Sequence, residues 1–293
     1  MTASRSGHRL EPLQGESISR GCRAELGALA PDLRVLDEVD STSSEAARWR
    51  GALAADDGRA VAVVADQQNT GRGRRGRSWR TAPGSAIHLS LARPVRTTHG
   101  LAPLGLACAI AVYEVLAAQG AEHLAIKWPN DIVCTSAGDR PYGKIGGLLL
   151  EASQRAGAQG DGVHEVVVGL GLNLHLPSAL RAALETETEY AVADLCALGL
   201  DPRARNALIV RLIVALSAAL VQFEALGFAA FRDRWPPVDM LRGREVVVSG
   251  TDGRLQRGVA GGIDIDGALC VHLDDMPAPL RVHAGEVSVR PLP

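Results

Sequence analysis

Six short apolar segments between residues 60 and 176 constrain the fold more than any other feature of the sequence. Turn residues separate these segments, which are residues 60–65, 86–92, 124–127, 131–134, 144–152 and 165–176. Apolar or alternating runs of this length, bounded by Gly, Pro, Asn or Asp, predict β-strands. A mostly buried helix is predicted at 101–119, before the third segment. The central region is therefore expected to be an α/β (α+β) domain in which helices flank a sheet.

A second helix is predicted immediately after these strands. Its apolar residues recur at intervals of three and four between Leu208 and Phe223. Asp201 is a suitable N-cap, Pro202 suits the first helical position, and Gly227 would end the helix.

The pattern of apolar residues changes after the segment RWPPVDML, residues 234–241, from a helical period to short alternating runs. Short β segments then follow one another closely, which predicts a small all-β barrel. At the other end, residues 1–30 are rich in Gly, Ser and Arg and predict a flexible tail. We therefore expect domains at 31–237 and 238–293.

Composition limits the possible classes of function. The chain has 31 basic and 33 acidic residues, a net charge of -2, which argues against a broad surface for nucleic acid or anionic lipid. Its five cysteines lie singly, without metal-site spacing, and this favours a reduced cytoplasmic location. The N-terminus lacks the apolar run of a signal peptide, and Pro103 and Glu114 interrupt the apolar stretch at 101–118, so we expect no membrane span.

Residues 71–79, GRGRRGRSW, place four arginines on a glycine-rich segment after a predicted strand. The segment has neither helical nor strand periodicity, which indicates a loop. Glycine lets backbone N–H groups approach an anion, and guanidinium groups bind phosphate or carboxylate oxygens. A phosphate-binding loop is one interpretation, and a solvated basic loop or an RNA-binding Arg–Gly segment is the other.

Residues 127–132, KWPNDI, place three chemically different polar groups at the end of a predicted strand. Lys127, Asn130 and Asp131 could together hold a phosphate, a polar ligand edge and a Mg²⁺ ion. The alternative is an ordinary Asn–Asp turn without a ligand.

Two further segments combine glycine with a polar side chain. In YGKIGGLLLE (142–151), Gly146 and Gly147 leave space for a ligand near Lys144, although such a lysine could also protect a sheet edge. In GLGLNLH (169–175), Asn173 offers an amide to a base or ribose, although Gly and Asn also mark β-bulges. His175 is interpreted as structural.

In this order, the four segments resemble the motifs of the biotin–protein ligases (biotin–[acetyl-CoA-carboxylase] ligases), from about Val39 to the C-terminus. The Ser-Thr pair of that family matches DSTSSE (40–45), and residues 258–290 resemble its SH3-like C-terminal domain. The resemblance implies a class II synthetase-like mixed sheet flanked by helices. It also implies that the protein makes biotinyl-5′-AMP from biotin and ATP and then transfers biotin to a lysine of a biotin carboxyl carrier protein.

The resemblance also assigns roles to residues. The biotin pocket would comprise Ser41, Thr42, Gln68, Gly71, Arg72, Lys144 and Gly147. The ATP or adenylate site would comprise Arg74, Arg77, Trp79, Lys127, Asn130 and Asn173, with Asp131 holding Mg²⁺. The catalytic charges would be Lys127, Arg72, Arg74 and Lys144, and the 71–79 loop would close as a lid. Ser43 stands where many members have Asn.

The resemblance finally implies partners. Members that repress biotin genes carry an N-terminal winged helix-turn-helix, for which about 30 residues are too few. We therefore expect a ligase without repressor activity, which modifies the carrier protein of acetyl-CoA or acyl-CoA carboxylase and binds neither nucleic acid nor membranes. A monomer or weak homodimer is expected.

Two alternatives remain. Lipoate ligases and octanoyltransferases share the catalytic fold, and a transferase of that kind needs a cysteine nucleophile. Cys134 is the one cysteine near a site motif, and we interpret it as a buried strand residue. An RNA-binding module is disfavoured by the net charge of -2 and an aromatic content of 3%.

Overall fold

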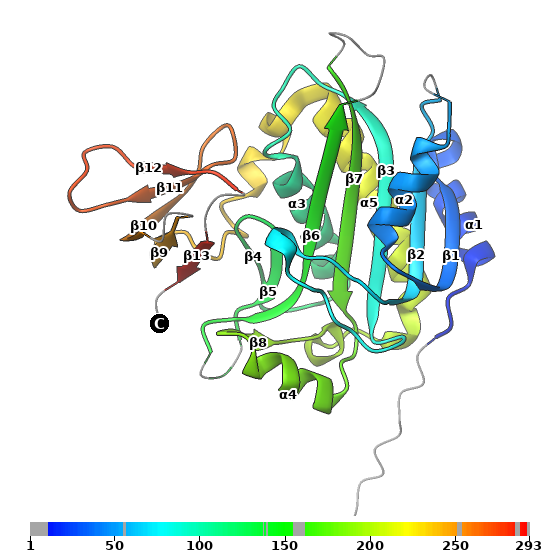
Figure 1. Ribbon diagram of the computed structural model, residues 1–293, viewed down its shortest axis with the longest axis horizontal. Coiled ribbons are helices and arrows are strands. Elements are labelled where there is room, and N and C mark those ends of the chain that lie inside the picture. Colours follow the sequence, from blue (N-terminus) through cyan, green and yellow to red (C-terminus); the bar gives the residue numbers. More distant parts are fainter. Residues whose placement is uncertain are drawn as a thin grey trace, which may run out of the picture.

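The computed structural model describes residues 11–54, 57–136, 138, 140–154, 162–250, 254–284 and 288–291. These residues form a large mixed sheet with helices on both faces and a smaller antiparallel sheet built from the C-terminal residues (Figure 1). The predicted class, a mixed sheet flanked by helices with a small C-terminal β domain, is confirmed.

The large sheet has the strand order β1-β2-β3-β7-β6-β5-β4. Its strands are β1 Asp32–Val39, β2 Val61–Gln68, β3 Ala86–Arg96, β4 Leu124–Lys127, β5 Asp131–Cys134, β6 Gly143–Gln154 and β7 Val163–Asn173. Only β1 and β2 are parallel along this path, and a short strand, β8 Ala191–Val192, pairs in parallel with β6. The motifs at 127–132, 142–151 and 169–175 lie on β4 to β7, which are neighbours in this order.

Alternating side chains of the large sheet pack into two cores. Val61 and Val63 of β2 pack with α2 (Thr42–Gly51) on one face. Ala62 and Val64 point to the other face, where the main core contains residues of α1 (Gly15–Leu26), α3 (Leu104–Ala118) and α5 (Arg205–Leu226). Figure 1 shows α2 in front of the sheet and α3 and α5 behind it. This period of two, with one face to each core, follows from strand geometry.

The predicted helix after residue 201 is present. Asp201 caps a short 3-10 turn by accepting a hydrogen bond from Arg203 N, and α5 ends at Gly227, whose φ is +63°. Residues 202–230 are long and apolar enough to span a membrane by composition, but 56% of their most apolar stretch is buried in the fold. That burial is typical of a core helix.

The expected flexible tail is wrong for the described part of residues 1–30. Residues 1–10 lie outside the described residues, but α1 packs on α5. Ile18 and Cys22 are buried, and a Cβ on Gly21 would lie 2.9 Å from Val210 Cγ2. Ile18 and Cys22 lie four residues apart on one face of the helix, and most other residues of this segment are polar or exposed.

The smaller sheet has the order β12-β11-β10-β9-β13. Its strands are β9 Glu245–Ser249, β10 Leu255–Ile263, β11 Leu269–His272, β12 Leu280–Val282 and β13 Ser288–Pro291. Residues 238–240, which precede it, hydrogen-bond to the outer edge of β4. The predicted start at residue 238 therefore falls in a segment that lies along the large sheet.

Candidate functional site

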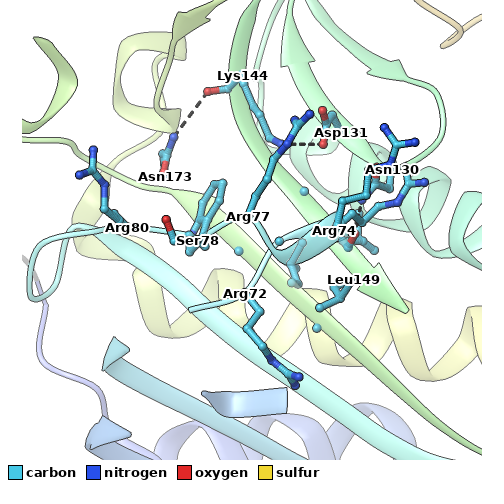
Figure 2. Close-up of a pocket in the computed structure, with 18 of the residues that line it drawn as sticks. Arg72, Arg74, Arg77, Ser78, Arg80, Asn130, Asp131, Lys144, Leu149 and Asn173 are labelled. Atoms are coloured by element: carbon cyan, nitrogen blue, oxygen red, sulfur yellow. Dashed lines mark hydrogen bonds and ion pairs between the residues drawn. The ribbon is translucent and has the colours of Figure 1, made fainter. Parts of the chain in front are cut away.

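A cavity of about 520 Å³ lies beneath the arginine–glycine loop (Figure 2). Except for Gly71, every residue predicted for the site lines it. These residues are Ser41, Thr42, Gln68, Arg72, Arg74, Arg77, Trp79, Lys127, Asn130, Asp131, Lys144, Gly147 and Asn173. The fold therefore brings together motifs that are separated by more than 130 positions in the sequence.

One end of the cavity is a chamber of hydroxyl and amide groups at the start of α2. Thr42 donates two hydrogen bonds to Gln68 Oε1, from its backbone N at 2.7 Å and from Oγ1 at 3.0 Å. Ser90 Oγ lies 2.8 Å from Thr42 Oγ1 and 3.0 Å from Ser43 Oγ, and all three side chains are buried. Ser90 was not predicted, although the alternation of residues 86–92 places it on the same face as His88. This end of the cavity suits a neutral ligand with donors and acceptors.

The arginine–glycine loop folds as a small hairpin. Trp79 N donates to Gly71 O at 2.8 Å, and Gly73 N donates to Arg77 O at 2.7 Å. Gly71 has no room for a side chain, because a Cβ would lie 2.5 Å from Trp79 O. At the tip, Arg75 has a φ of +59°. The expectation that these glycines free backbone N–H groups for an anion is therefore wrong at Gly73, whose N–H closes the hairpin.

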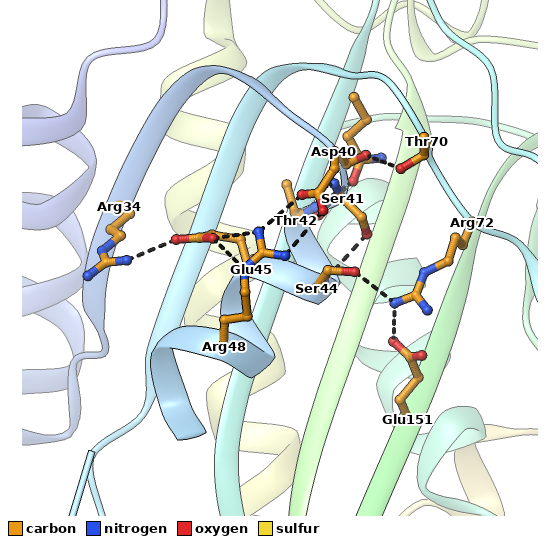
Figure 3. Close-up of polar contacts among 11 residues, drawn as sticks. Arg34, Asp40, Ser41, Thr42, Ser44, Glu45, Arg48, Thr70, Arg72 and Glu151 are labelled. Carbon is orange, nitrogen blue, oxygen red and sulfur yellow. Dashed lines mark hydrogen bonds and ion pairs between the residues drawn. The ribbon is translucent and has the colours of Figure 1, made fainter. Parts of the chain in front are cut away.

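The arginines of the loop point in different directions. Arg74 Nη1 donates to Asn130 Oδ1 at 3.2 Å, inside the cavity. Arg72 instead reaches the rim, where its Nη2 donates to Ser44 Oγ at 3.2 Å and pairs with Glu151 Oε2 at 3.1 Å (Figure 3). Figure 2 shows Arg72 directed away from Lys144. Arg72 therefore lines the cavity without joining its central charges.

Three charged side chains form the floor of the cavity. Lys144 Nζ lies 2.7 Å from Asp131 Oδ1. Burial lowers the pKa of Lys127, and Lys144 and Arg74 lower it further, although Asp131 opposes them. Burial would raise the pKa of Asp131, but the positive charges of Lys144 and Lys127 outweigh it and hold that pKa below its usual value. The positive charges of Lys127, Lys144 and Arg74 therefore exceed the single negative charge of Asp131 at the floor of the cavity.

Glycines place Trp79 and the β5 turn against the sheet. A Cβ on Gly171 would lie 2.9 Å from the Trp79 indole, and one on Gly147 would lie 3.1 Å from Asp131 Oδ1. Gly146 has a different role, because its Cβ would lie 2.3 Å from Gly171 O, within the sheet. Trp79 Nε1 is buried and has no hydrogen-bond partner in the part of the chain that the structure describes. This N–H therefore packs against the backbone of β7 at Gly171.

Asn173 has a structural role in addition to lining the cavity. Its Nδ2 donates to Ala193 O at 3.0 Å and to Lys144 O at 3.5 Å, and its side chain is almost fully buried (Figure 2). The amide therefore ties the segment after β8 to β6.

One wall of the cavity was not predicted from the sequence. It comes from the region of α4 (Ser178–Thr186) and β8, with one residue of β13, and comprises Leu184, Glu187, Thr188, Tyr190, Val192 and Val289. Tyr190 stacks on Tyr142 with ring centroids 5.4 Å apart, and Glu187 pairs with Arg80 at 2.8 Å. This segment carries no glycine or lysine motif, so no signal in the sequence marks it.

The cavity favours anions. Among the described residues that line it, seven are basic (Arg72, Arg74, Arg75, Arg77, Arg80, Lys127 and Lys144) and two are acidic (Asp131 and Glu187). No cluster of three or more His, Cys, Asp or Glu side chains that could hold a metal ion occurs among the described residues. The site is therefore built for a polyanionic ligand.

Comparison with known proteins agrees with this arrangement. The model of the biotin/lipoate A/B protein ligase family matches residues 41–173, and that of the biotin protein ligase C terminal domain matches residues 242–290. The biotin–[acetyl-CoA-carboxylase] ligase of Mycobacterium tuberculosis is 31% identical over 95% of this chain and 97% of its own length. That of Paracoccus denitrificans is 32% identical over 80% of this chain and 92% of its own length.

Two further relatives extend the comparison. The bifunctional ligase/repressor BirA of Escherichia coli is 34% identical over 87% of this chain and 73% of its own length. Among solved structures, the biotin protein ligase from Aquifex aeolicus in complex with biotin and ATP shares the fold, with a TM-score of 0.68 and 24% identity over 89% of this chain and 99% of that one. The chain belongs to the biotin protein ligase family.

Proposed function

We propose that the protein condenses biotin with ATP to biotinyl-5′-AMP and then transfers the biotinyl group to a lysine of a biotin carboxyl carrier protein. One observation carries the proposal: a single cavity joins a chamber of neutral polar groups to a cluster of buried positive charges. Biotin has a neutral ureido ring at one end and a carboxylate at the other, and ATP is polyanionic. Two relatives are named biotin–[acetyl-CoA-carboxylase] ligases.

The chamber would hold the ureido ring of biotin. Ser41, Thr42, Ser43 and Gln68 lie at this end of the cavity, where hydroxyl groups donate or accept as the ligand requires. The carboxylate of biotin would then point toward Lys144, which lines the same cavity.

The first step joins two anions, so its main obstacle is electrostatic. A carboxylate oxygen of biotin would attack the α-phosphorus of ATP, form a new P–O bond and displace pyrophosphate. Lys127, Lys144 and Arg74 would offset the repulsion and the charge that develops on the leaving group. Arg72 would contribute only after leaving Glu151 and Ser44. Trp79, Arg77, Asn130 and Asn173 complete the proposed nucleotide side of the cavity.

The second step needs protection from water, because biotinyl-AMP is a mixed anhydride. The hairpin of residues 71–79 would act as a lid that excludes solvent. The neutral amine of the acceptor lysine would attack the acyl carbon, an amide bond would form, and AMP would leave with the anhydride oxygen. A carboxylate or the phosphate would accept the proton of the amine.

Mg²⁺ fits the site only as a companion of the nucleotide. Magnesium prefers octahedral oxygen ligands, and Asp131 would supply one carboxylate that already pairs with Lys144. The nucleotide phosphates and water would therefore supply most of the ligands. When bound, the ion would neutralise phosphate charge.

The direct test is incubation of the protein with biotin, ATP and Mg²⁺. We expect biotinyl-AMP and pyrophosphate in the absence of an acceptor, and label on a biotin carboxyl carrier domain when one is added. Biotin should also raise the melting temperature, whereas single-stranded RNA should not. Failure to form biotinyl-AMP under these conditions would refute the proposal.

Several sequence-based expectations remain predictions. We expect no repressor activity, no nucleic-acid or membrane partner, a cytoplasmic location, and a monomer or weak homodimer. The octanoyltransferase alternative loses support, because Cys134 is buried and does not line the cavity.

A further inference from the structure

Lys127 lies between two residues that are both bound by C-terminal segments of the chain. On one side, Ile126 N donates to Val238 O at 2.7 Å, and Met240 N donates to Ile126 O at 3.0 Å. On the other side, the indole Nε1 of Trp128 donates to Gly267 O at 3.0 Å. The backbone around Lys127 is thus held by residues that follow it by more than 100 positions.

The ammonium group of Lys127 has no polar partner among the described residues that would fix its position. Only 8% of its surface is exposed, and its Nζ lies 5.7 Å from the centre of the Tyr142 ring. Within the described ranges, no hydrogen bond or ion pair holds Nζ. Its place in the cavity therefore depends on the backbone of residues 126–128.

The turn that contacts Trp128 connects β10 to β11 and is held by hydrogen bonds and ion pairs. Asp264 Oδ1 accepts hydrogen bonds from Asp266 N at 2.9 Å and from Ala268 N at 3.0 Å. Arg281 pairs with Asp264 at 2.5 Å and with Asp266 at 2.6 Å. These contacts surround Gly267, whose carbonyl accepts the hydrogen bond from Trp128.

The turn is also wedged against the large domain. Gly267 has a φ of +76°, and a Cβ there would lie 2.8 Å from Pro103 Cβ and 3.1 Å from Leu106 Cδ1. Trp128 is only 1% exposed, so its indole fills the space between this turn and the cavity. A side chain at position 267 would therefore force the turn to shift relative to Pro103 and Leu106, and this shift would disturb the hydrogen bond with Trp128.

We infer that the β10–β11 turn is a positioning element for Lys127 and acts through the hydrogen bond from Trp128 to Gly267. This inference rests on the proposed function, in which Lys127 offsets charge during adenylate formation. The small sheet thus takes part in the first chemical step, although most of it lies outside the cavity. The effect is one of placement, because the turn contacts Trp128 rather than the ligands.

The test compares three variants of the full chain. Gly267→Ala displaces the turn, and Trp128→Phe removes the indole donor while keeping an aromatic ring. Gly243→Ala is the matched control, because Gly243 has a φ of +75° and no atom lies within 4 Å of the position that its Cβ would take. The control therefore reproduces the backbone strain without the contact with Pro103 and Leu106.

We expect Gly267→Ala and Trp128→Phe to lower the rate constant of biotinyl-AMP formation roughly ten- to a hundredfold. Biotin should still bind with unchanged affinity and one-to-one stoichiometry, because the hydroxyl chamber lies on other elements. The double variant should lose no more than the stronger single variant, since both changes break one contact. Gly243→Ala should match the wild type.

Three results would overturn the inference. One is a wild-type rate in both site variants. Another is an equal loss in Gly243→Ala. The third is a lower rate of biotinyl-AMP formation that returns to the wild-type value once it is divided by the fraction of protein that binds biotin. Such a result would indicate partial unfolding. A wild-type protein that makes no biotinyl-AMP at all would instead refute the proposed function.

Discussion

The ammonium of Lys144 lies 2.7 Å from the carboxylate of Asp131, on neighbouring strands at the floor of the cavity. This ion pair neutralises part of a cluster that also contains Lys127 and Arg74. The remaining positive charge is available for ligand phosphates and a ligand carboxylate. Asp131 therefore has a structural role, because its negative charge reduces the repulsion among Lys144, Lys127 and Arg74.

Asp131→Asn should destabilise the protein. The two side chains are 20% and 18% exposed, so we expect a loss of about 2 to 3 kcal/mol, below the 3 to 5 kcal/mol of a fully buried pair. Because the folded-state pKa of Asp131 is lowered, its contribution is present above the unfolded pKa and is lost as pH falls through the folded pKa. Urea unfolding between pH 7 and pH 3 should therefore show less acid sensitivity in the variant. Equal acid sensitivity of both proteins would contradict this assignment.

Lys127→Ala should remove most of the pyrophosphate release that depends on biotin. The lost charge compensation predicts a fall of roughly 100-fold or more. Lys127 has a lowered pKa, so its positive charge is lost at a lower pH than that of an ordinary lysine, and the wild-type rate should decline on the alkaline side. In Lys127→Arg, any remaining rate should persist to higher pH. Near-normal release by Lys127→Ala would exclude the proposed role.

The sequence predicts all strands of the large sheet except β1 and the two-residue β8, and the edge strand β4 was predicted at its observed bounds. Strands β2, β3, β5, β6 and β7 are apolar on at least one face, and each was found within a few residues. Strand β1 was missed, because this edge strand mixes charged and apolar residues, with none of its positions fully buried. Helix α1 was also missed, since only Ile18 and Cys22 of its 12 residues are buried.

In the site as well, the sequence identified the residues that belong to a local pattern and missed those that do not. Residues in short motifs, such as Lys127 and Asp131, were found because several unusual residue types occur together. Ser90 lies behind the cavity wall, where it contacts Thr42 and Ser43, and Tyr190 lines the cavity through the fold of residues 174–192. Neither residue belongs to a motif. The direction of Arg72 was also not predictable, since its partner Glu151 lies 79 positions away.

Cys134→Ser should leave ligation intact. Cys134 is 2% exposed, and its Sγ donates to Ser136 O at 3.4 Å, away from the cavity. The rate of carrier labelling should stay within about threefold, because no thiol intermediate is used. The four other cysteines should behave in the same way when replaced by serine. Loss of labelling with Cys134→Ser, in a protein that still binds biotin, would favour acyl transfer through a thioester.

Arg74→Gly should release biotinyl-AMP into solution. The variant loses a charged hydrogen-bond donor that fixes the hairpin to Asn130, an interaction worth about 1.5 to 3 kcal/mol, or roughly ten- to a hundredfold in release rate. Labelling of bystander proteins should rise accordingly, as streptavidin blots of a mixture with albumin would show. Arg203→Gly is the charge-matched control, because Arg203 is exposed and pairs with Asp201. An unchanged labelling pattern would argue against the lid.

Gly169→Ala and Gly171→Ala should separate the two halves of the cavity. The glycines lie two positions apart on β7, but a Cβ at Gly169 would lie 2.4 Å from Ser43 Oγ, whereas one at Gly171 would lie 2.9 Å from the Trp79 indole. Overpacking of this kind costs about 1 to 3 kcal/mol, or roughly five- to 150-fold in affinity. Gly169→Ala should therefore weaken biotin binding, and Gly171→Ala should raise the KM for ATP. Calorimetry and steady-state kinetics on both variants check this, and the same defect in both would show that the two halves of the cavity do not act separately.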